Sequence, residues 1–375
     1  MKSHLRWSVV VLCCVLTLFS CSNEASQQGA GSQSEHYTIG VNLPLSGNAA
    51  YFGSELYKGL ALSFAEAEKQ YGCRFEILAE DNRFLPQEAV GIAKKFIHLT
   101  KPNVIVSGYS NVLQATIPLT EESGIPMIAS LSSVAEIAKN KQWVIRDFSL
   151  ESQLMPLLAE YVFRTANLKT GSFLVVNDDF GHDSRKYFTQ AFETLGGNIT
   201  EGAVYSEDDL DFRNLVQKIL VNKPQFMLVI GRGAGMANAI RQIREADPTV
   251  LICGSSSFDN DKIMASLGQD AEKLVFANFH RNTTSQAYAA ADKLFTENYQ
   301  QGMNWVNLLG FSLGEYVAEA LVKCKGDAKE IMDYLRSNEF NTIRGKLTVN
   351  GNNDMLSGLS VFIRENAKNI EIVNN

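Results

Sequence analysis

Gly310-Phe311-Ser312-Leu313-Gly314 is the stretch whose residue types point most directly to catalysis. The G-x-S-x-G spacing is that of the nucleophile elbow of α/β-hydrolases, in which a histidine that follows the serine in the chain activates it. All five histidines precede Ser312 (His4, His36, His98, His182 and His280). The apolar residues from Trp305 to Leu321 also continue at helical spacing through the motif. We therefore expect a buried helix, and a secreted serine hydrolase using Ser312 is the least favoured alternative.

Two further motifs resemble cofactor sites but lack their partners. The stretch from Gly231 to Met236 follows an apolar run, as in a dinucleotide fingerprint, but its sixth position is methionine. The next predicted strand ends at Cys253 without the acidic residue that would bind a ribose. Asp179-Phe180-Gly181 matches the kinase triplet without the other kinase motifs. No metal-binding spacing of His, Cys or acidic residues occurs, so the sequence predicts neither a catalytic residue nor a cofactor or metal ion.

The N-terminus has the order of an export signal. A basic start is followed by about eleven apolar residues ending at Phe19, and then by Ser20-Cys21. The run is too short for a membrane-spanning helix, which needs roughly 20 residues. Leu18 to Cys21 resembles the lipobox of bacterial lipoproteins. We expect a signal peptide at 1–20 and a lipidated, flexible tether at 21–36, with lipidation at Cys21; an ordinary signal peptide with an incidental cysteine stays open.

The cysteines after the tether, Cys73, Cys253 and Cys324, are too few for all to pair, and one disulfide among them remains open. The formal net charge is −7, with both signs spread along the chain. Without a basic patch, nucleic acid is not an expected partner.

From Tyr37 onward, short apolar strands alternate with amphipathic helices. This order is typical of an α/β fold with mostly parallel sheets covered by helices on both faces. The expected strands are 37–43, 74–78, 104–107, 125–130, 172–177, 198–205, 225–230 and 249–253, followed by a β segment at 342–373. The expected helices are 53–71, 86–99, 181–195, 212–222, 234–246, 259–267, 285–300 and 305–323. Ligands of such folds bind beyond the carboxyl ends of the strands.

Several stretches, in order along the chain, resemble the Leu/Ile/Val-binding family of type I periplasmic binding proteins. They are Ile39 to Gly47 with Tyr51-Phe52-Gly53, Glu80-Asp81-Asn82, Glu122 to Ile128, Asp179-Phe180-Gly181, Asp211-Phe212, Gly310-Phe311 and Gly345 to Thr348. The resemblance implies two doubly wound lobes joined by a hinge, with lobe one at 37–148 plus 281–340 and lobe two at 149–280 plus 341–375. Closure of the lobes would hold the ligand between them.

The resemblance also implies a function. An extracytoplasmic solute-binding lipoprotein would capture a small polar ligand, such as an amino acid-like molecule, a carboxylate or an amide, and deliver it to an ABC permease for import. A ligand sensor or partner-binding lipoprotein of the same fold, without a transporter, is the alternative.

The resemblance places candidate ligand-binding residues in loops after strands. Ser110, Asn111, Ser132 and Ser133 would hold a carboxylate at the starts of two helices. Ser133 to Glu136 also reads as a capping box, so Ser133 could instead cap its helix. Phe52 and Phe180 correspond to aromatic residues that face the ligand.

The chain departs from the family where amino-acid-binding relatives hold the ligand ammonium with a tyrosine and a glutamate. Arg232-Gly233 and Ser256-Ser257 fall at those places. A buried ammonium without a counter-ion costs several kcal/mol. We therefore hypothesise that the ligand is not a simple aliphatic amino acid and that Arg232 meets an anionic group. Asp179 or Asp259 would be the substitute counter-ion for an ammonium.

Overall fold

The structure is a computed structural model that describes residues 35–372, except 48 and 135. The predicted signal peptide and Cys21 lie outside the described residues. None of the helices in the described part is both long and apolar enough to cross a bilayer.

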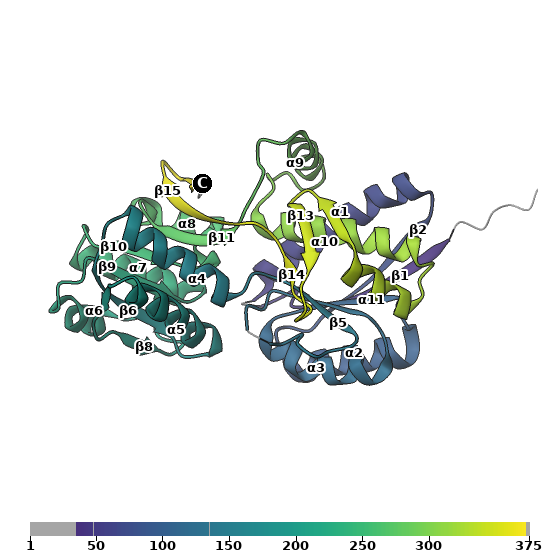
Figure 1. Cartoon of the computed structure of the whole chain (residues 1–375), viewed down its shortest axis with the longest axis horizontal. Helices are drawn as coiled ribbons and strands as arrows, with labels where there is room; N and C mark the ends of the chain where they lie inside the picture. The colour runs from purple at the N-terminus through teal and green to yellow at the C-terminus, as the bar shows by residue number, and fades with distance from the viewer. Residues whose placement is uncertain (1–34, 48, 135, 373–375) are drawn as a thin grey trace, which may run out of the picture. The chain divides into compact units, whose positions relative to one another are not determined.

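The first lobe is built on a five-stranded parallel sheet in the order β2-β1-β3-β4-β5. Figure 1 labels β1, β2 and β5 of this sheet and the helices beside it. Strands β3 and β4 are buried along their whole length, as expected for parallel strands covered on both faces. The strands are β1 (His36–Leu43), β2 (Arg74–Asp81), β3 (Val104–Gly108), β4 (Met127–Ser130) and β5 (Val144–Asp147). The helices are α1 (Ala50–Tyr71), α2 (Pro86–Lys95), α3 (Ser110–Ser123), α9 (Gln286–Tyr299), α10 (Trp305–Lys323) and α11 (Ala328–Ser337), with a π-helical turn η1 (Phe96–Thr100) after α2.

The second lobe is built on a sheet in the order β16-β15-β11-β10-β9-β6-β7, with β8 also paired to β6. Its central strands are parallel, whereas β15 and β16 add an antiparallel edge. The strands are β6 (Thr170–Val176), β7 (Asn198–Ile199), β8 (Ala203–Tyr205), β9 (Phe226–Ile230), β10 (Leu251–Gly254), β11 (Val275–Phe279), β15 (Leu359–Glu365) and β16 (Lys368–Ile372). The helices are α4 (Glu151–Glu160), α5 (Asp179–Thr194), α6 (Arg213–Leu220), α7 (Gly233–Ala246) and α8 (Asp261–Leu267), with short turns η2 (Tyr161–Thr165), η3 (Ser256–Asp259) and η4 (Gly268–Ala271).

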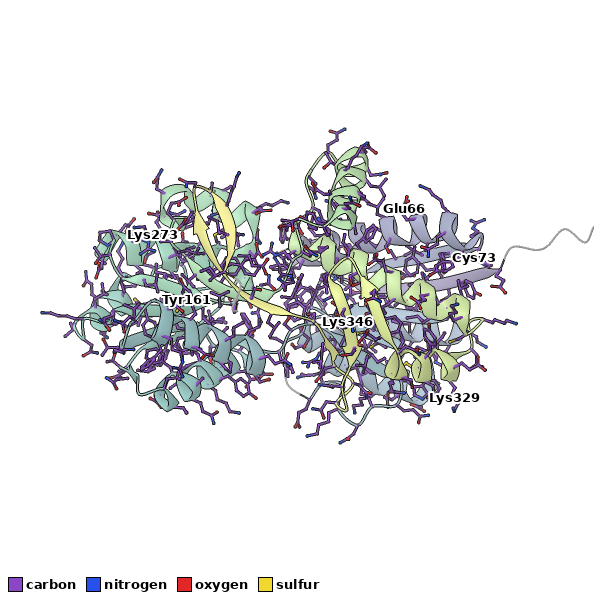
Figure 2. All side chains as sticks on the ribbon, turned by 45° about the horizontal axis from the view of Figure 1, so that its top comes forward. Glu66, Cys73, Tyr161, Lys273, Lys329 and Lys346 are labelled. Carbon is purple, nitrogen blue, oxygen red and sulfur yellow. The ribbon has the colours of Figure 1, made fainter. Side chains whose placement is uncertain are left out.

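Charged side chains cover the outside of these layers, as Figure 2 shows for Lys273, Lys329 and Lys346. Lys329 pairs with Asp333 at 2.6 Å, one turn away on α11. Exposed pairs of this kind add little to stability. The three cysteines of the described chain, Cys73, Cys253 and Cys324, are free thiols.

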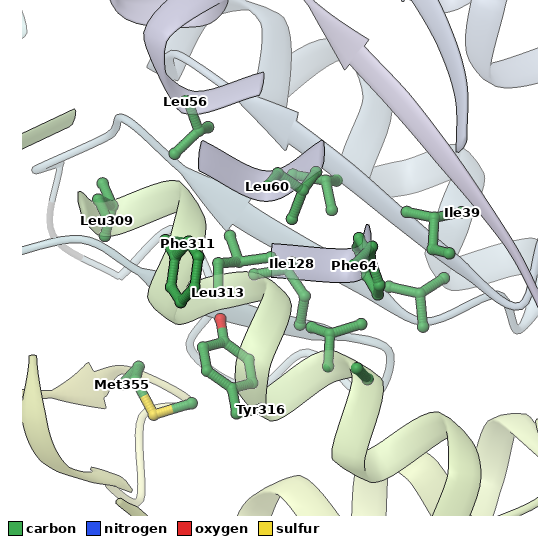
Figure 3. Packing of buried hydrophobic residues seen from close by; sticks show 14 of the residues in the cluster. Ile39, Leu56, Leu60, Phe64, Ile128, Leu309, Phe311, Leu313, Tyr316 and Met355 are labelled. Atoms are coloured by element: carbon green, nitrogen blue, oxygen red, sulfur yellow. The ribbon is translucent and has the colours of Figure 1, made fainter. Parts of the chain in front are cut away.

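The two faces of the first sheet bury separate sets of side chains, because successive residues of a strand point to opposite faces. Ile39 and Ile128 face α1 and α10, where Leu60 and Leu313 complete the packing (Figure 3). Ile105 and its neighbours on the other face pack against α2 and α3. The second lobe has its own core around Phe188, Phe226 and Ile240. The α/β fold with two parallel-sheet lobes is therefore confirmed.

Helices α1 and α10 pack so closely that glycines are needed at their contact. A Cβ on Gly310 would lie 2.1 Å from the Leu56 carbonyl oxygen, and one on Gly59 would lie 1.9 Å from the Asn307 carbonyl oxygen. Ser312 is fully buried within α10 and donates to Thr342 Oγ1 at 2.9 Å. The G-x-S-x-G motif is thus a helix-packing motif and exposes no nucleophile.

The stretch after β4 differs from the prediction of a helix capped by Ser133. No helix occurs between 131 and 143 in the part of this stretch that is described, and Glu136 has a φ of +66°. Side chains from elsewhere donate hydrogen bonds to backbone carbonyl groups that would accept from backbone amides in a helix. Arg146 Nη1 donates to the Val134 oxygen at 2.8 Å, and Asn353 Nδ2 donates to the Ala138 oxygen at 3.0 Å. Ser133 therefore does not cap a helix.

The last part of the chain also differs from the predicted division, which placed all of 341–375 in lobe two. Strands β12 (Glu339–Thr342), β13 (Gly345–Val349) and β14 (Met355–Leu356) form a separate antiparallel sheet. Ile343, Leu347 and Met355 are buried in the core of the first lobe. The chain joins the second sheet only from Leu359. The lobe boundaries remain predictions, and this packing argues for moving 341–356 to lobe one.

Candidate functional site

A cavity of about 300 Å³ lies where loops after the strands of both sheets meet. The size and the position of this cavity suit a small ligand, because ligand sites of α/β folds occur beyond the carboxyl ends of parallel strands. The first lobe contributes Phe52, Phe84, Tyr109, Ser110, Asn111, Gln114, Leu131, Ser133, Phe148 and Trp305. The second lobe contributes Asp178, Asp179, Phe180, Glu207, Arg232, Ser256 and Ser257.

The structure brings most of the predicted site residues to this cavity. Its lining includes Phe52, Ser110, Asn111, Ser133, Asp179, Phe180 and Arg232. Ser132 is the exception, since it does not line the cavity and lies behind Ser110, with 2.8 Å between the two Oγ atoms. Ser132 can therefore orient the Ser110 hydroxyl. A role for these residues in binding stays a prediction.

Four aromatic residues of the lining were missed by sequence reasoning: Phe84, Tyr109, Phe148 and Trp305. The Phe84 and Tyr109 rings meet edge to face, 5.0 Å apart. The Trp305 ring packs against Phe52 at 5.7 Å and against Phe148 at 6.1 Å. Together with Phe52 and Phe180, these rings make the cavity strongly aromatic. Tyr109 comes two residues after the predicted strand 104–107, and that position was the one available signal for it.

Three lining residues have left-handed backbones, although none is glycine. Their φ angles are +65° at Phe84, +71° at Tyr109 and +52° at Leu131. Bulky residues rarely adopt this conformation, and such strain gathers at functional sites. Hydrogen bonds hold the strained turns, since Asn82 Oδ1 accepts from the Phe84 amide at 2.9 Å and the Tyr109 hydroxyl donates to the Ala49 oxygen at 2.8 Å.

Arg232 reaches the cavity from the start of α7 and is already paired. Its Nη1 lies 2.6 Å from Asp178 Oδ2, and its guanidinium stacks 4.5 Å from the centre of the Phe180 ring. Asp178 also caps α5 by accepting from the Gly181 amide at 2.9 Å. Both side chains of the ion pair are about one-third exposed, so solvent screens the pair and its main effect is to orient the guanidinium.

The two halves of the cavity differ in charge. The first-lobe half presents the N-terminus of α3 with Ser110, Asn111 and Ser133, and no acidic side chain. The second-lobe half presents Asp178, Asp179 and Glu207 against the single cation Arg232. An anionic group is therefore better placed against the first lobe, where helix amides and hydroxyls donate.

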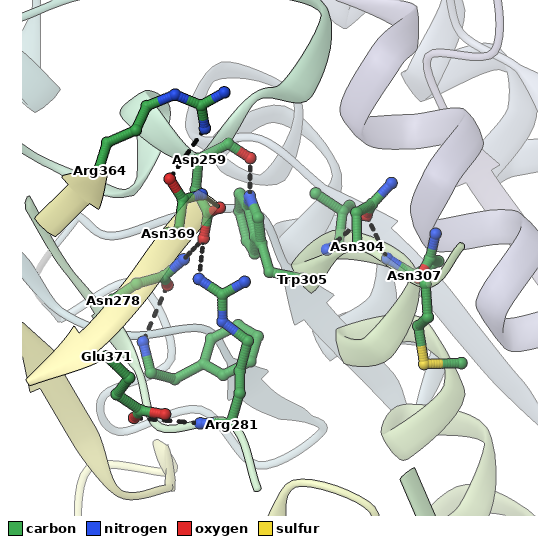
Figure 4. Close-up of polar contacts among 12 residues, drawn as sticks. Asp259, Asn278, Arg281, Asn304, Trp305, Asn307, Arg364, Asn369 and Glu371 are labelled. Carbon is green, nitrogen blue, oxygen red and sulfur yellow. Dashed lines mark hydrogen bonds and ion pairs between the residues drawn. The ribbon is translucent and has the colours of Figure 1, made fainter. Parts of the chain in front are cut away.

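Asp259 does not face a ligand, contrary to the hypothesis that it could hold an ammonium. It is 3% exposed, and its carboxylate accepts from Asn278 Nδ2 at 3.0 Å, from Asn369 Nδ2 at 2.6 Å and from Arg281 (Figure 4). Its backbone oxygen accepts from Trp305 Nε1 at 2.8 Å. Asp259 thus ties a cavity-lining ring of the first lobe to the second lobe.

Glu151 is a buried acid beside the cavity that sequence reasoning missed. Its Oε2 accepts from Ser184 Oγ at 2.9 Å, while Oε1 has no partner among the described residues. Burial raises the pKa of Glu151 to about 7, against the opposing effects of the Ser184 and Ser133 hydroxyls and of Arg232. The helix start Glu151-Ser152-Gln153 is polar in sequence, and it gave no signal that its first carboxyl group is buried. Among the described residues, no group of three or more His, Cys, Asp or Glu is arranged to hold a metal ion.

Comparison with known proteins agrees with this architecture. The periplasmic binding protein family matches residues 36–364. The Leu/Ile/Val-binding protein of Escherichia coli K12 is 22% identical over 330 residues, which cover 86% of this chain and 88% of that protein. The Leu/Ile/Val-binding protein BraC3 of Rhizobium johnstonii is 25% identical over 338 residues, which cover 85% of this chain and 89% of that protein.

Solved structures show the same fold at low sequence identity. The branched-chain amino acid substrate-binding protein LivJ of Streptococcus pneumoniae, in complex with isoleucine, has a TM-score of 0.82 at 18% identity and covers 90% of this chain and 100% of that chain. A solute-binding protein of an ABC transporter from R. palustris, in complex with benzoate, has a TM-score of 0.80 at 18% identity, with coverages of 90% and 95%.

The family match extends over most of the chain and both lobes, and it confirms the resemblance read from the motifs. Because the family consists of non-enzymatic binding proteins, the prediction that the chain is no enzyme is also confirmed. The chain belongs to the periplasmic binding protein family.

Proposed function

We propose that the chain is an extracytoplasmic solute-binding lipoprotein that captures a small aromatic carboxylate in the cavity between its lobes and delivers it to an ABC importer. The observation that carries this proposal is the cavity itself, in which six aromatic side chains lie around a helix N-terminus that carries polar side chains. The six aromatic residues are Phe52, Phe84, Tyr109, Phe148, Phe180 and Trp305.

The carboxylate end of the ligand belongs against the first lobe. Helix α3 has 14 residues and begins at Ser110, so its first amides and its dipole favour an anion there. The Ser110 and Ser133 hydroxyls lie in the same wall. Acidic side chains of the other half would repel a carboxylate placed near them.

The body of the ligand belongs among the rings. Aromatic side chains pack best on flat apolar groups, by stacking or by edge-to-face contact. Structural neighbours give independent support for this ligand class, because R. palustris solute-binding proteins of this fold are found with benzoate and 4-hydroxybenzoate.

A zwitterionic amino acid with an aromatic side chain is the second candidate. Asp179 and Glu207 are exposed on the second-lobe half of the cavity. An aromatic acid without an ammonium group would offer these two carboxylates no positive charge to pair with. They would supply the counter-charge for an ammonium that Asp259, bound within its own network, does not. Aliphatic amino acids would leave the aromatic wall poorly filled.

Calorimetric titration of the mature protein tests the ligand class. We expect benzoate or 4-hydroxybenzoate to bind more tightly than phenylalanine, and leucine to bind weakest. A ligand present at 100 times its dissociation constant adds about 2.7 kcal/mol to stability, so a thermal-shift screen can precede calorimetry. Ser110→Ala, in the wall proposed to hold the carboxylate, should weaken binding, whereas Lys329→Gln on the exposed surface of α11 should not. Tight leucine or valine binding without aromatic-acid binding would refute the proposal.

The anchor and the transporter are separate parts of the proposal. Stable membrane attachment needs more than one acyl chain, as a lipidated Cys21 would provide. Cys21→Ala should release the protein from the membrane fraction while ligand binding stays unchanged. Permease and ATPase genes beside its own favour import. Their absence, with binding intact, would favour the sensor reading.

A further inference from the structure

Arg232 lies in a turn that two glycines make possible. It comes two residues after β9, between Gly231 and Gly233, and directly before α7. A Cβ on Gly231 would lie 1.8 Å from the Tyr205 hydroxyl oxygen, and Gly233 has a φ of +55°. Larger residues would disturb both places. The stretch that resembles a dinucleotide fingerprint is therefore a turn that fixes where the Arg232 side chain leaves the backbone.

The guanidinium of Arg232 is held at its edge and on one face. Its Nη1 donates to Asp178 Oδ2 at 2.6 Å, and Asp178 is itself fixed as the cap of α5. Arg232 Cζ lies over the Phe180 ring, 4.5 Å from its centre, and Phe180 is only 9% exposed. A guanidinium is planar, with its donors in the plane and two weakly hydrated faces. Arg232 lines the cavity, and no second aromatic ring among the described residues lies over it.

The charge of Arg232 is poorly placed to hold a carboxylate. Asp178 is already paired with it, and Asp179 and Glu207 line the same half of the cavity. Three carboxylates stand against one guanidinium there, so an anionic group would be repelled from this half. An uncharged aromatic ring meets no such repulsion, and a cation attracts the face of a ring. The flat face of the guanidinium therefore suits the ring of a ligand better than its carboxylate.

We infer that Arg232 selects the aromatic ring of the ligand, which stacks on the guanidinium face opposite Phe180. The inference rests on the proposed function, because it requires an aromatic acid whose carboxylate lies at the start of α3. Such a ligand contacts the first lobe through its carboxylate and the second lobe through its ring. An acid without an aromatic ring lacks the contact with Arg232, and an electron-poor ring weakens it.

Benzoate and cyclohexanecarboxylate separate a contact with the ring from a contact with the charge. Both acids carry a carboxylate on a six-membered ring, but only benzoate is aromatic. Arg232→Met keeps an unbranched side chain and removes the guanidinium. In calorimetric titrations of this variant, benzoate should bind about twofold to thirtyfold more weakly than it binds the parent protein. The dissociation constant of cyclohexanecarboxylate should stay the same.

Arg213→Met is the matched control. Arg213 also lies at the start of a helix, α6, with its Nη1 3.4 Å from Asp211 Oδ1, but it does not line the cavity. Both acids should bind this variant as they bind the parent protein. If both bind Arg232→Met more weakly by the same factor, Arg232 holds the carboxylate; if neither changes, it does not contact the ligand. Either result would overturn this inference and leave the proposed function standing.

Substituted benzoates give a measurement that needs no variant, in case Arg232→Met fails to fold. The acids 4-methoxybenzoate and 4-nitrobenzoate have similar size and the same charge, but the nitro group withdraws electrons from the ring. The parent protein should bind the methoxy acid roughly twofold or more tightly, because a cation attracts an electron-rich face more strongly. Equal affinities, or tighter binding of the nitro acid, would overturn this inference. Failure of benzoate and of both substituted acids to bind would overturn the proposed function as well.

Discussion

Glu151 has a consequence for stability that needs no ligand. Its folded-state pKa of about 7 lies above the usual value of 4.5 for an unfolded chain, so the fold disfavours the ionised form. The resulting loss in the free energy of unfolding is absent below pH 4.5, grows as pH rises, and is complete above pH 7. The shift corresponds to about 3 kcal/mol.

Glu151→Gln removes the charge and keeps the shape of the side chain. We expect the variant and the parent protein to have similar free energies of unfolding near pH 5, and the variant to be more stable by up to about 3 kcal/mol at pH 8. Urea unfolding at the two pH values measures the difference. If the difference in the free energy of unfolding between the two proteins is the same at both pH values, the fold does not raise the pKa of Glu151.

Residues of the site divide into those that the sequence could predict and those that it could not. Ser110, Ser133 and Arg232 follow strands, and their place in the alternating pattern put them at the cavity. Phe84 reaches it through a turn with positive φ that Asn82 holds. A pattern of residue types does not reveal such a turn, because most residues avoid that backbone conformation.

At the scale of elements, the contact between α1 and α10 shows how a motif can be explained by packing alone. Gly310→Ala would place a Cβ 2.1 Å from the Leu56 carbonyl oxygen, so one helix must move. We expect a loss of about 1–3 kcal/mol in the free energy of unfolding, as for other overpacked contacts.

Gly91 on α2 is the matched control, since nothing lies within 4 Å of the Cβ that it would gain. Gly91→Ala should stabilise the protein by up to about 1 kcal/mol through helix propensity. Urea unfolding of both variants measures the contrast. Equal and small effects at the two sites would show that α1 and α10 can separate without cost.

Whole elements could be predicted where the periodic pattern of apolar residues extends over many residues. Helix α10 runs from Trp305 to Lys323, as its stripe of apolar residues indicates. The helix expected after β4 does not form, and Arg146 of the next strand and Asn353 near the end of the chain bind carbonyl groups of that stretch. A capping box is a local signal, and it cannot register competition from side chains elsewhere in the chain.

At the scale of the molecule, the alternation of strands and helices predicted two sheets, whereas the points at which the chain crosses between the lobes came from the family resemblance. Apolar residues at 343, 347 and 355 fit a strand in either lobe. Packing against the first core decides between them. Only the long pairing of β15 with β11 then carries the chain into the second sheet.

Trp305 connects the lobes beside the cavity. Its ring belongs to the first core, and its indole N–H donates to the Asp259 backbone oxygen of the second lobe at 2.8 Å. Asp259 is itself fixed by Arg281, Asn278 and Asn369 (Figure 4). A bond between hinged lobes stabilises the arrangement in which both of them line the cavity, and so it favours the ligand-holding state.

Trp305→Phe keeps an aromatic ring but leaves the buried Asp259 oxygen without its donor, at a cost of about 1–3 kcal/mol. If that cost falls on the ligand-holding state, affinity for benzoate should drop by roughly fivefold to a hundredfold. Calorimetry measures the dissociation constant, with Trp143→Phe, a residue that does not line the cavity, as control. Unchanged affinity with an equally lowered melting temperature, with and without benzoate, would show that the bond supports the fold and does not bias the lobes.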